Sequence, residues 1–244
     1  MAVRHLLELS LDTLLSAMAQ TGCGRPHVVF AGGAHYISPE IRAEVDREIL
    51  DELGSLGLVR GRELTGDFED TLHLLDRPDT EYYTFIRTGD VQYTALVAAK
   101  GRDAVAAAHR DGTVWLGPAE DNDLTGTLAA QLPDFPPAEF TPFSVRQEEF
   151  AALERADAYE RSRDASAMAA LLEPPHYGLG YLHVARRAAG GREEASATLS
   201  YLDAEAGRIG IELSGPPGNQ YLNLFPGDAD RLAGKIASIR ARLD

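Results

Sequence analysis

The stretch that decides the fold is Val114-Trp115-Leu116-Gly117-Pro118, because its pattern returns 108 positions later as Leu222-Asn223-Leu224-Phe225-Pro226. Both stretches are short alternating apolar runs closed by proline, and each leads into a segment with helical spacing of apolar residues. Side chains alternate between the faces of a strand with period two, so an even offset keeps matched residues on the same face. The sequence therefore predicts an internal duplication whose two copies share one sheet.

Residues after and before the two runs extend the match. Leu124, Gly126, Leu128 and Ala129 fall on Leu232, Gly234, Ile236 and Ala237, and Tyr93 falls on Tyr201. Residues 133–142 hold four prolines, too many for a helix or a central strand, and we place the boundary between the copies there. We expect an N-terminal half at 1–140 and a C-terminal half at 141–244, each with helices, a strand meander and a closing helix, together forming one compact domain.

Apolar spacing and start signals predict the helices. Ser10 or Asp12 starts the first, Ser38-Pro39 starts the second, and Asp228 caps the last. A break is expected near Ser162. The expected helical segments are 6–15, 39 to about 54 or 57, 65–75, 147–172 and the residues after 228.

Alternating apolar residues predict the strands, and two tight turns predict how they pair. Gly89-Asp90 and Asp111-Gly112 accept the positive φ angles that short hairpin turns require, so antiparallel pairing follows. The resulting fold class is α+β with a central antiparallel sheet. The expected strands are 81–88, 91–97, 104–110, 113–117, 179–187, 195–203, 209–213 and 220–225.

Composition excludes several classes of partner. With 244 residues, 44% of them hydrophobic, the chain can bury a sizeable core. Its formal net charge of −15 repels phosphate backbones and anionic lipids, so we expect neither nucleic acid nor membrane as a partner. Cys23 is the single cysteine, which suits a reducing compartment. The chain opens without a basic-then-apolar leader, and its apolar stretches are shorter than a bilayer requires, so we expect a cytoplasmic location.

The sequence offers no local motif for catalysis, a cofactor or a metal. Its histidines are scattered without an HExxH pair. Cys23 and His27 share a glycine-rich loop that supplies no orienting group. Gly32-Gly33 lacks the lysine of a phosphate loop, and Asp228-Ala229-Asp230 is more typical of a helix cap than of a calcium loop. We therefore expect no catalytic, cofactor-binding or metal-binding residues.

Three local sequences stand out beside the order of the elements: Glu52-Leu53 with Leu56-Gly57-Leu58-Val59, then Leu74-Leu75-Asp76-Arg77-Pro78, and the Asp111-Gly112 hairpin. Over essentially the whole chain this pattern resembles the EspG family, which is associated with the ESX, or type VII, secretion systems of actinobacteria. The resemblance implies a central antiparallel sheet flanked by two helical bundles with pseudo-two-fold symmetry. It also implies a cytosolic chaperone, without enzyme activity, that keeps a PE/PPE-type helical secretion substrate soluble until export.

The resemblance further implies where the client binds. Family contacts come from the sheet, from the loop joining its early strands, and from the second helical bundle. Carried onto this sequence, the loop is Arg87, Thr88, Gly89 and Asp90, with Gln92 and Thr94 beside it. The bundle is 147–172, where the polar positions that meet a basic rim on the client are Glu149, Glu154 and Asp157.

Two aromatic residues are further candidates from the strand pattern alone. Trp115 and Tyr221 share a face opposite Val114 and Leu222. If that face is open to solvent, the two aromatic side chains can anchor a partner. If helices cover both faces of the sheet, the same two residues belong to the core.

The remaining candidates also have plainer interpretations. Gly89-Asp90 can be a turn without a binding role, and the acidic helix positions can form a solvent-exposed face. The alternative function is a small-molecule-binding or hydrolytic α+β enzyme, which requires His109, His183 and a carboxylate to converge in an enclosed pocket.

Overall fold

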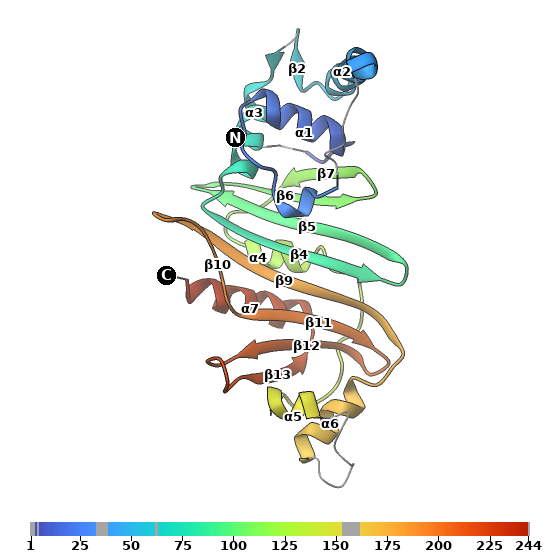
Figure 1. Cartoon of the computed structure of the whole chain (residues 1–244), viewed down its shortest axis with the longest axis vertical. Helices are drawn as coiled ribbons and strands as arrows, with labels where there is room; N and C mark the ends of the chain where they lie inside the picture. The colour runs from blue at the N-terminus through green and yellow to red at the C-terminus, as the bar shows by residue number, and fades with distance from the viewer. Residues whose placement is uncertain (1–2, 4, 33–38, 62, 153–161, 244) are drawn as a thin grey trace. The chain divides into compact units, whose positions relative to one another are not determined.

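The computed structural model has an α+β fold built on a large antiparallel sheet, as predicted (Figure 1). It describes residues 3, 5–32, 39–61, 63–152 and 162–243. The chain divides into two compact units. Unit 1 comprises Met1–Tyr83, Tyr93–Leu128 and Ala185–Glu193, and unit 2 comprises Thr84–Gln92, Ala129–Val184 and Glu194–Asp244. Strands β4 (Thr80–Thr88) and β9 (His176–Ala188) contribute residues to both.

Unit 1 is a meander of strands with helices at its N-terminal end. Its strands follow the hydrogen-bonded order β1-β7-β6-β5-β4. The new strands are β1 (Leu7–Ser10), β5 (Val91–Lys100), β6 (Asp103–Arg110) and β7 (Thr113–Pro118), with a small β2–β3 hairpin (Val59–Arg60 and Glu63–Leu64) apart from them. The helices are α1 (Leu11–Gln20), α2 (Pro39–Ser55), α3 (Gly66–Asp76) and α4 (Leu124–Ala129), with a 3-10 turn at Val28–Phe30.

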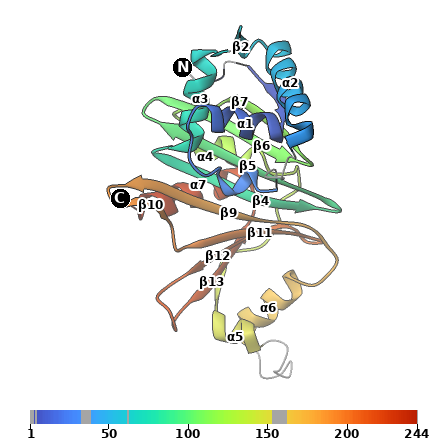
Figure 2. The ribbon, with the colours of Figure 1, turned by 45° about the horizontal axis from the view of Figure 1, so that its top comes forward.

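One face of the unit 1 strands is buried under the first helices. Leu7, Leu116, Ala107 and Leu96 stand opposite one another across four strands, and each is at most 3% exposed. Helix α1 packs on β7 (Figure 2). On the same face, the Val29 carbonyl accepts a hydrogen bond from Thr94 Oγ1 at 2.8 Å. The chain from α1 to the 3-10 turn therefore closes this face.

A carboxylate of α2 fixes the start of α1. Glu52 accepts hydrogen bonds from the Ser10 backbone N–H, the Ser10 hydroxyl and the Thr13 hydroxyl. Ser10 also caps the helix, because its Oγ accepts from the Thr13 N–H at 3.1 Å. Burial raises the pKa of Glu52, but these hydrogen bonds outweigh burial and hold the pKa below its ordinary value of 4.5.

Unit 2 is the second strand assembly. Its strands follow the order β4-β9-β11-β12-β13-β8. Strand β10 (Gly191–Glu194) pairs with β9, and most of it belongs to unit 1. The strands not yet placed are β8 (Phe143–Arg146), β11 (Thr198–Ala204), β12 (Gly207–Ser214) and β13 (Tyr221–Pro226). The helices are α5 (Gln147–Ala152), α6 (Arg163–Leu171) and α7 (Ala229–Ala241).

A row of alternating glycine and aromatic residues crosses the strands of unit 2. Gly180 lies opposite Tyr201, Tyr201 opposite Gly210, and Gly210 opposite Phe225. A Cβ atom at Gly180 would lie 2.3 Å from the Tyr201 ring, and one at Gly210 would lie 2.3 Å from the Phe225 ring. Each ring therefore occupies the space over a glycine, which fixes the pairing register. Helix α7 lies on this face, since Lys235 Nζ is 5.3 Å from the Phe225 ring centroid.

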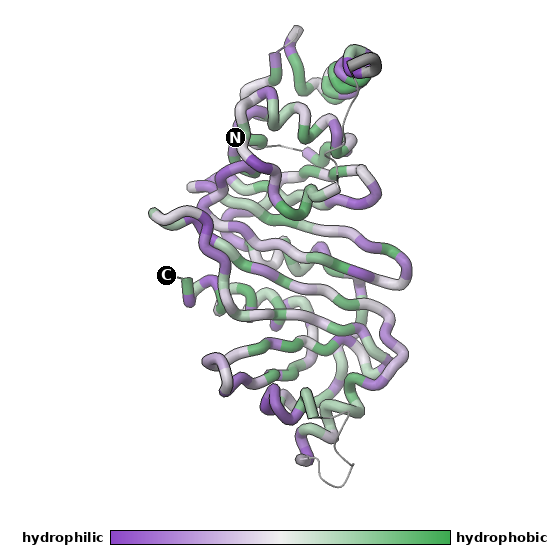
Figure 3. The backbone as a smooth tube through the Cα atoms, viewed as in Figure 1, coloured by the Kyte–Doolittle hydropathy of each residue, from purple (hydrophilic) through white to green (hydrophobic). Residues whose placement is uncertain are grey.

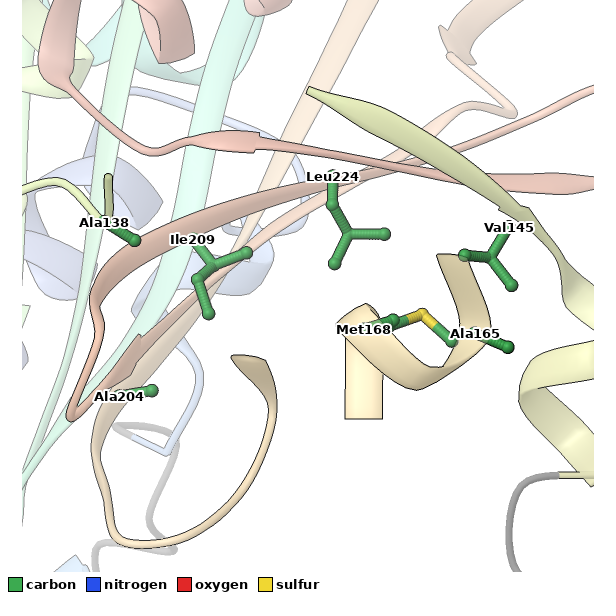
Figure 4. Packing of buried hydrophobic residues seen from close by; sticks show 7 residues of the cluster. All are labelled: Ala138, Val145, Ala165, Met168, Ala204, Ile209 and Leu224. Atoms are coloured by element: carbon green, nitrogen blue, oxygen red, sulfur yellow. The ribbon is translucent and has the colours of Figure 1, made fainter. Parts of the chain in front are cut away.

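The opposite face of unit 2 carries its apolar core under α6. Met168 and Ala165 of α6 form one buried cluster with Leu224 and Ile209, and Figure 4 shows Met168 and Ala165 below Leu224 and Val145. All five side chains are at most 2% exposed. Ser162 caps α6 through a 3.1 Å bond from the Ala165 N–H, as the expected break near Ser162 suggests.

The proline-rich segment packs along unit 2. The Arg208 N–H donates to the Pro136 carbonyl at 2.7 Å, and the Ala138 N–H donates to the Arg208 carbonyl at 3.0 Å. The buried Arg208 guanidinium binds both carboxylate oxygens of Asp203, at 2.6 and 2.9 Å, and the Pro133 carbonyl. A doubly hydrogen-bonded pair of this kind leaves neither buried charge unsatisfied.

Local signals locate most elements, but several short strands, β3 and β10 among them, differ from expectation. The Asp111-Gly112 turn has the predicted positive φ angles of 49° and 78°. Residues 7–10 were expected within a helix but form β1, because they pair with β7 and the helix begins only after the Ser10 cap. Strand β8 was not expected, and it forms by pairing with β13. Of the expected 147–172 helix, 153–161 lie outside the described residues.

Among the helices of the described residues, none has the length and apolar character needed to cross a membrane.

Gly180→Ala tests the glycine and aromatic row. The added methyl group meets the Tyr201 ring, so we expect a loss of about 1–3 kcal/mol in the free energy of unfolding, measured by urea denaturation. Gly190→Ala is the control. A Cβ atom there meets nothing within 4 Å, and the substitution lowers the conformational entropy of the unfolded chain as Gly180→Ala does. Equal stability of the two variants would contradict the close packing at Gly180.

Glu52→Gln tests the contact between α1 and α2. A carboxylate whose folded pKa is lowered stabilises the fold above its unfolded pKa and loses that contribution as the pH falls through the folded value. We expect the variant to be less stable than the wild type at neutral pH, with the difference shrinking below pH 4.5. Thermal denaturation at several pH values measures it. A difference that stays constant down to acid pH would show that the charge of Glu52 is not involved.

Candidate functional site

Unit 2 presents an exposed tyrosine on the sheet face that carries α6. Tyr177 and Tyr181 of β9 are each 48% exposed. Tyr181 stands opposite Ser200, and Ser200 stands opposite Ile211, so Tyr181 lies on the face of Ile211 and Leu224. Helix α6 covers part of that face, and Tyr181 marks a part that it leaves open. Tyr177 lies where the pairing of β9 shifts register, and its ring centroid is 6.0 Å from that of Phe135, which lies beside the Arg208 guanidinium on the opposite face.

The glycines of β9 lie on the face opposite Tyr181. A Cβ atom at Gly178 would meet the Asp203 carboxylate, and one at Gly180 would meet the Tyr201 ring. Colouring by hydropathy shows apolar positions separated by neutral and polar ones along these strands (Figure 3). Half-buried apolar residues continue the open face across the neighbouring strands: Leu179, Leu202, Ile211, Leu213 and Leu222.

The first strand of unit 2 extends this face toward the predicted loop. The Phe85 and His183 rings meet edge to face with centroids 5.7 Å apart, and His183 Nδ1 lies 3.0 Å from Glu194 Oε1. Arg87 follows Phe85 by two positions on β4 and is exposed. The Gly89 N–H donates to the Tyr177 carbonyl at 2.8 Å. The predicted loop Arg87, Thr88, Gly89 and Asp90 is therefore anchored beside Tyr177.

Helix α5 adds an exposed aromatic residue. Phe150 is 43% exposed. The neighbouring Glu149 accepts a 2.6 Å hydrogen bond from the Ser162 hydroxyl and is half-buried, so it connects α5 to the start of α6. Glu154 and Asp157 lie outside the described residues.

The other predicted contact residues point elsewhere. Thr94 of β5 bonds the Val29 carbonyl on the helix-covered face of unit 1. Trp115 lies on the other face of that unit, where its Nε1 donates to Glu8 at 2.9 Å. In unit 2, Tyr221 is half-buried on the face opposite Leu222 and Leu224, with the Arg146 guanidinium 5.9 Å from its ring centroid. Gln92 is exposed at the start of β5, two positions before Thr94.

The residues of the alternative enzyme interpretation contact different groups. His109 Nδ1 lies 2.9 Å from the Val29 carbonyl, while His183 contacts Glu194. Cys23 Sγ lies 3.8 Å from His73 Nδ1 and not beside His27. Within the residues that the structure describes, no group of three or more His, Cys, Asp or Glu side chains is arranged to hold a metal ion.

His27 belongs to a buried cluster in unit 1. Its Nε2 lies 3.5 Å from Glu81 Oε1, and Arg192 Nε contacts the same carboxylate. Burial raises the pKa of Glu81, but His27 and Arg192 outweigh burial and hold the pKa below its ordinary value. The Tyr83 ring lies beside both groups, with its centroid 4.8 Å from that of His27 and 5.5 Å from the Arg192 guanidinium carbon. The cluster joins the segment 21–32 to β4.

Sequence reasoning missed Tyr177 and Tyr181. The signal was present in the alternation of glycine with tyrosine at 177–181, since glycine in a strand marks a close approach on its own face. The expected strand began at residue 179, after the first of these tyrosines.

Comparison with solved structures identifies a similar fold. A structure described as the Mycobacterium tuberculosis type VII secretion system chaperone EspG5 in complex with a PE25-PPE41 dimer contains a chain that matches with a TM-score of 0.72. The match covers 96% of this chain and 95% of that chain at 13% sequence identity. At this identity the likeness concerns the fold alone.

Sequence comparison gives the family. No curated protein sequence matches the chain. The model of the EspG family matches residues 10–238, which is nearly the whole length. The chain therefore belongs to the EspG family.

Proposed function

We propose that this protein is a cytoplasmic chaperone of a type VII (ESX) secretion system that binds a PPE-like helical substrate and keeps it soluble before export. Two facts support this, namely membership of the EspG family and a fold shared with a chain solved together with a PE25-PPE41 dimer. The observation that carries the proposal on this chain is the exposed Tyr181 on the sheet face that α6 covers only in part.

The open face suits an apolar helical tip. Tyrosine combines a large apolar ring with a hydroxyl and has few rotatable bonds, so it loses little conformational entropy on binding. The half-buried Leu179, Leu202 and Ile211 on the face of Tyr181 provide an apolar floor. A substrate helix that covers this floor removes apolar surface from water on both proteins, which suppresses aggregation of the substrate.

The loop and the α5–α6 end form the rim of the proposed surface. Arg87, Thr88, Gly89 and Asp90 lie beside Tyr177, and we include Gln92 next to them. At the other end Phe150 is an apolar contact, while Glu154 and Asp157 remain proposed partners for a basic rim of the client. Glu149 supports this surface through its bond to Ser162. Thr94 bonds within unit 1, where it remains a proposed contact. Trp115 and Tyr221 face away within their own units, and we propose each as a contact for a partner other than the client.

We also propose that the chain is an internal duplication of two helical bundles and two strand meanders, with halves at 1–140 and 141–244. In the first half Leu7 of β1 stands opposite Leu116, and in the second Phe143 of β8 stands opposite Leu224. Leu116 and Leu224 are 108 positions apart, and in each half the edge strand directly precedes a helix. The equivalent edge pairings support the repeat.

The β5–β6 and β11–β12 hairpins also correspond, but at a shorter offset than the 108 positions that relate Leu116 to Leu224. Lys100 pairs with Asp103, and Ala204 pairs with Gly207, 104 positions later. The connection to the last strand is longer in the second half, at 215–220 against 111–112. In this alignment Val97, and not Tyr93, is the counterpart of Tyr201.

We propose a binding protein and not an enzyme. His109 and His183, on which the enzyme interpretation depends, contact a backbone carbonyl and Glu194 respectively. Binding a helical client requires no reacting group, and the aromatic face supplies what such binding needs.

Tyr181→Glu tests the proposal. An aromatic anchor that is buried on binding is worth about 2 kcal/mol or more, and placing charge there opposes burial, so we expect the Kd for a co-expressed PPE-like substrate to rise more than about thirtyfold. Co-purification followed by titration calorimetry measures the change.

Tyr221→Glu is the matched control, because it makes the same substitution on the opposite face of unit 2. Retention of the complex by Tyr221→Glu with its loss in Tyr181→Glu supports the open face. Full binding by a correctly folded Tyr181→Glu variant would remove that face from the proposal.

A further inference from the structure

A pocket of ≈ 510 Å³ lies between α7 and the strands β13 and β8 of unit 2. Its lining contains three cationic residues, Arg231, Lys235 and Arg242, and no acidic residue. This composition is unusual in a chain with a formal net charge of −15. The local charge therefore favours an anionic ligand, in contrast to the rest of the surface.

Contacts below the pocket hold its cations in place. Lys235 Nζ lies 2.7 Å from Glu212 Oε2, and Arg242 Nη2 lies 3.0 Å from Glu212 Oε1. Arg231 Nε lies 3.2 Å from Asp228 Oδ2. Three cations thus share two carboxylates, which leaves one positive charge uncompensated. The Glu212 side chain is 3% exposed, while those of Arg231, Lys235 and Arg242 are 52%, 37% and 53% exposed.

The pKa of Glu212 agrees with this arrangement. Burial raises the pKa, but Lys235 and Arg242 outweigh burial and hold it below its ordinary value. The carboxylate is therefore charged at neutral pH, and it orients both cations while leaving their remaining donors for a ligand.

The spacing of the cations favours an extended ligand over a small one. Arg231, Lys235 and Arg242 follow one side of α7, and eleven residues of helix span about 16 Å. An extended peptide covers that distance in about five residues at roughly 3.3 Å each. The pocket hydroxyls are engaged within the chain, Ser144 with Asn223 and Ser238 with the Gly234 carbonyl. Few neutral donors remain to surround a single phosphate group.

We propose that this pocket binds an extended acidic segment of a partner protein, about five residues long, through Arg231, Lys235 and Arg242. Asn223 and Phe225, which line the pocket, point to the face of β13 opposite Leu224. The acidic segment therefore binds on the opposite face of unit 2 from Tyr181. The site is independent of the proposed client surface, and both can be occupied together.

The test is fluorescence polarisation with a labelled Asp-Glu-Asp-Glu-Asp peptide and the full chain. Ser144→Asp adds a carboxylate to the pocket and retains all three cations, so we expect binding to weaken about tenfold. Ser166→Asp is the control, because it adds the same charge at an exposed position of α6 and should leave the affinity unchanged. Raising the salt from about 50 to about 300 mM should also weaken binding several-fold.

Three results would overturn the proposal: absence of peptide binding by the wild type, equal affinity of the Ser144→Asp and Ser166→Asp variants, or displacement of the peptide by an equal concentration of inorganic phosphate. The last result would identify a site for small anions only. The Ser144→Asp variant should still form the complex with a PPE-like substrate, so failure of this proposal is distinguishable from failure of the proposed function.

Discussion

The packing of aromatic rings over glycines in unit 2 is the constraint on which the functional surface depends. Tyr201 lies between Gly180 and Gly210, and Phe225 lies over Gly210. A slip of one residue in any of these strands would place a side chain under a ring and turn every neighbouring side chain to the other face. The row therefore fixes which residues of β9 are buried and which meet water.

This constraint divides unit 2 into two faces with different chemistry. On the side of the rings, α7 and the proline-rich segment cover the strands, and the Arg208 guanidinium pairs with the Asp203 carboxylate. On the other side, α6 covers Leu224 and Ile209 but leaves Tyr181 exposed. An open aromatic face serves association with a partner, and a charged pocket beside α7 adds a second surface of opposite character.

The sequence predicts those elements whose signals are local. The Asp111-Gly112 turn, the helix that starts at Pro39 and the Asp228 cap follow from residues adjacent in the chain. Strands β1 and β8 escape such reasoning, because each is short and is stabilised by a partner strand far along the chain. The same limit applies to Thr94 and Trp115, whose side-chain partners Val29 and Glu8 come from distant segments. Family resemblance indicated the binding role, and the alternation around Gly180 located the face only once the strand pairing was known.

Site-specific photo-crosslinking tests the central claim, that the Tyr181 face of unit 2 receives the helical substrate, most directly. A photoreactive phenylalanine analogue at position 181 retains the aromatic ring, and the same analogue at position 221 probes the opposite face. With a co-expressed PPE-like substrate, we expect a covalent adduct from position 181 and none from position 221. An adduct from position 221 alone would contradict the account.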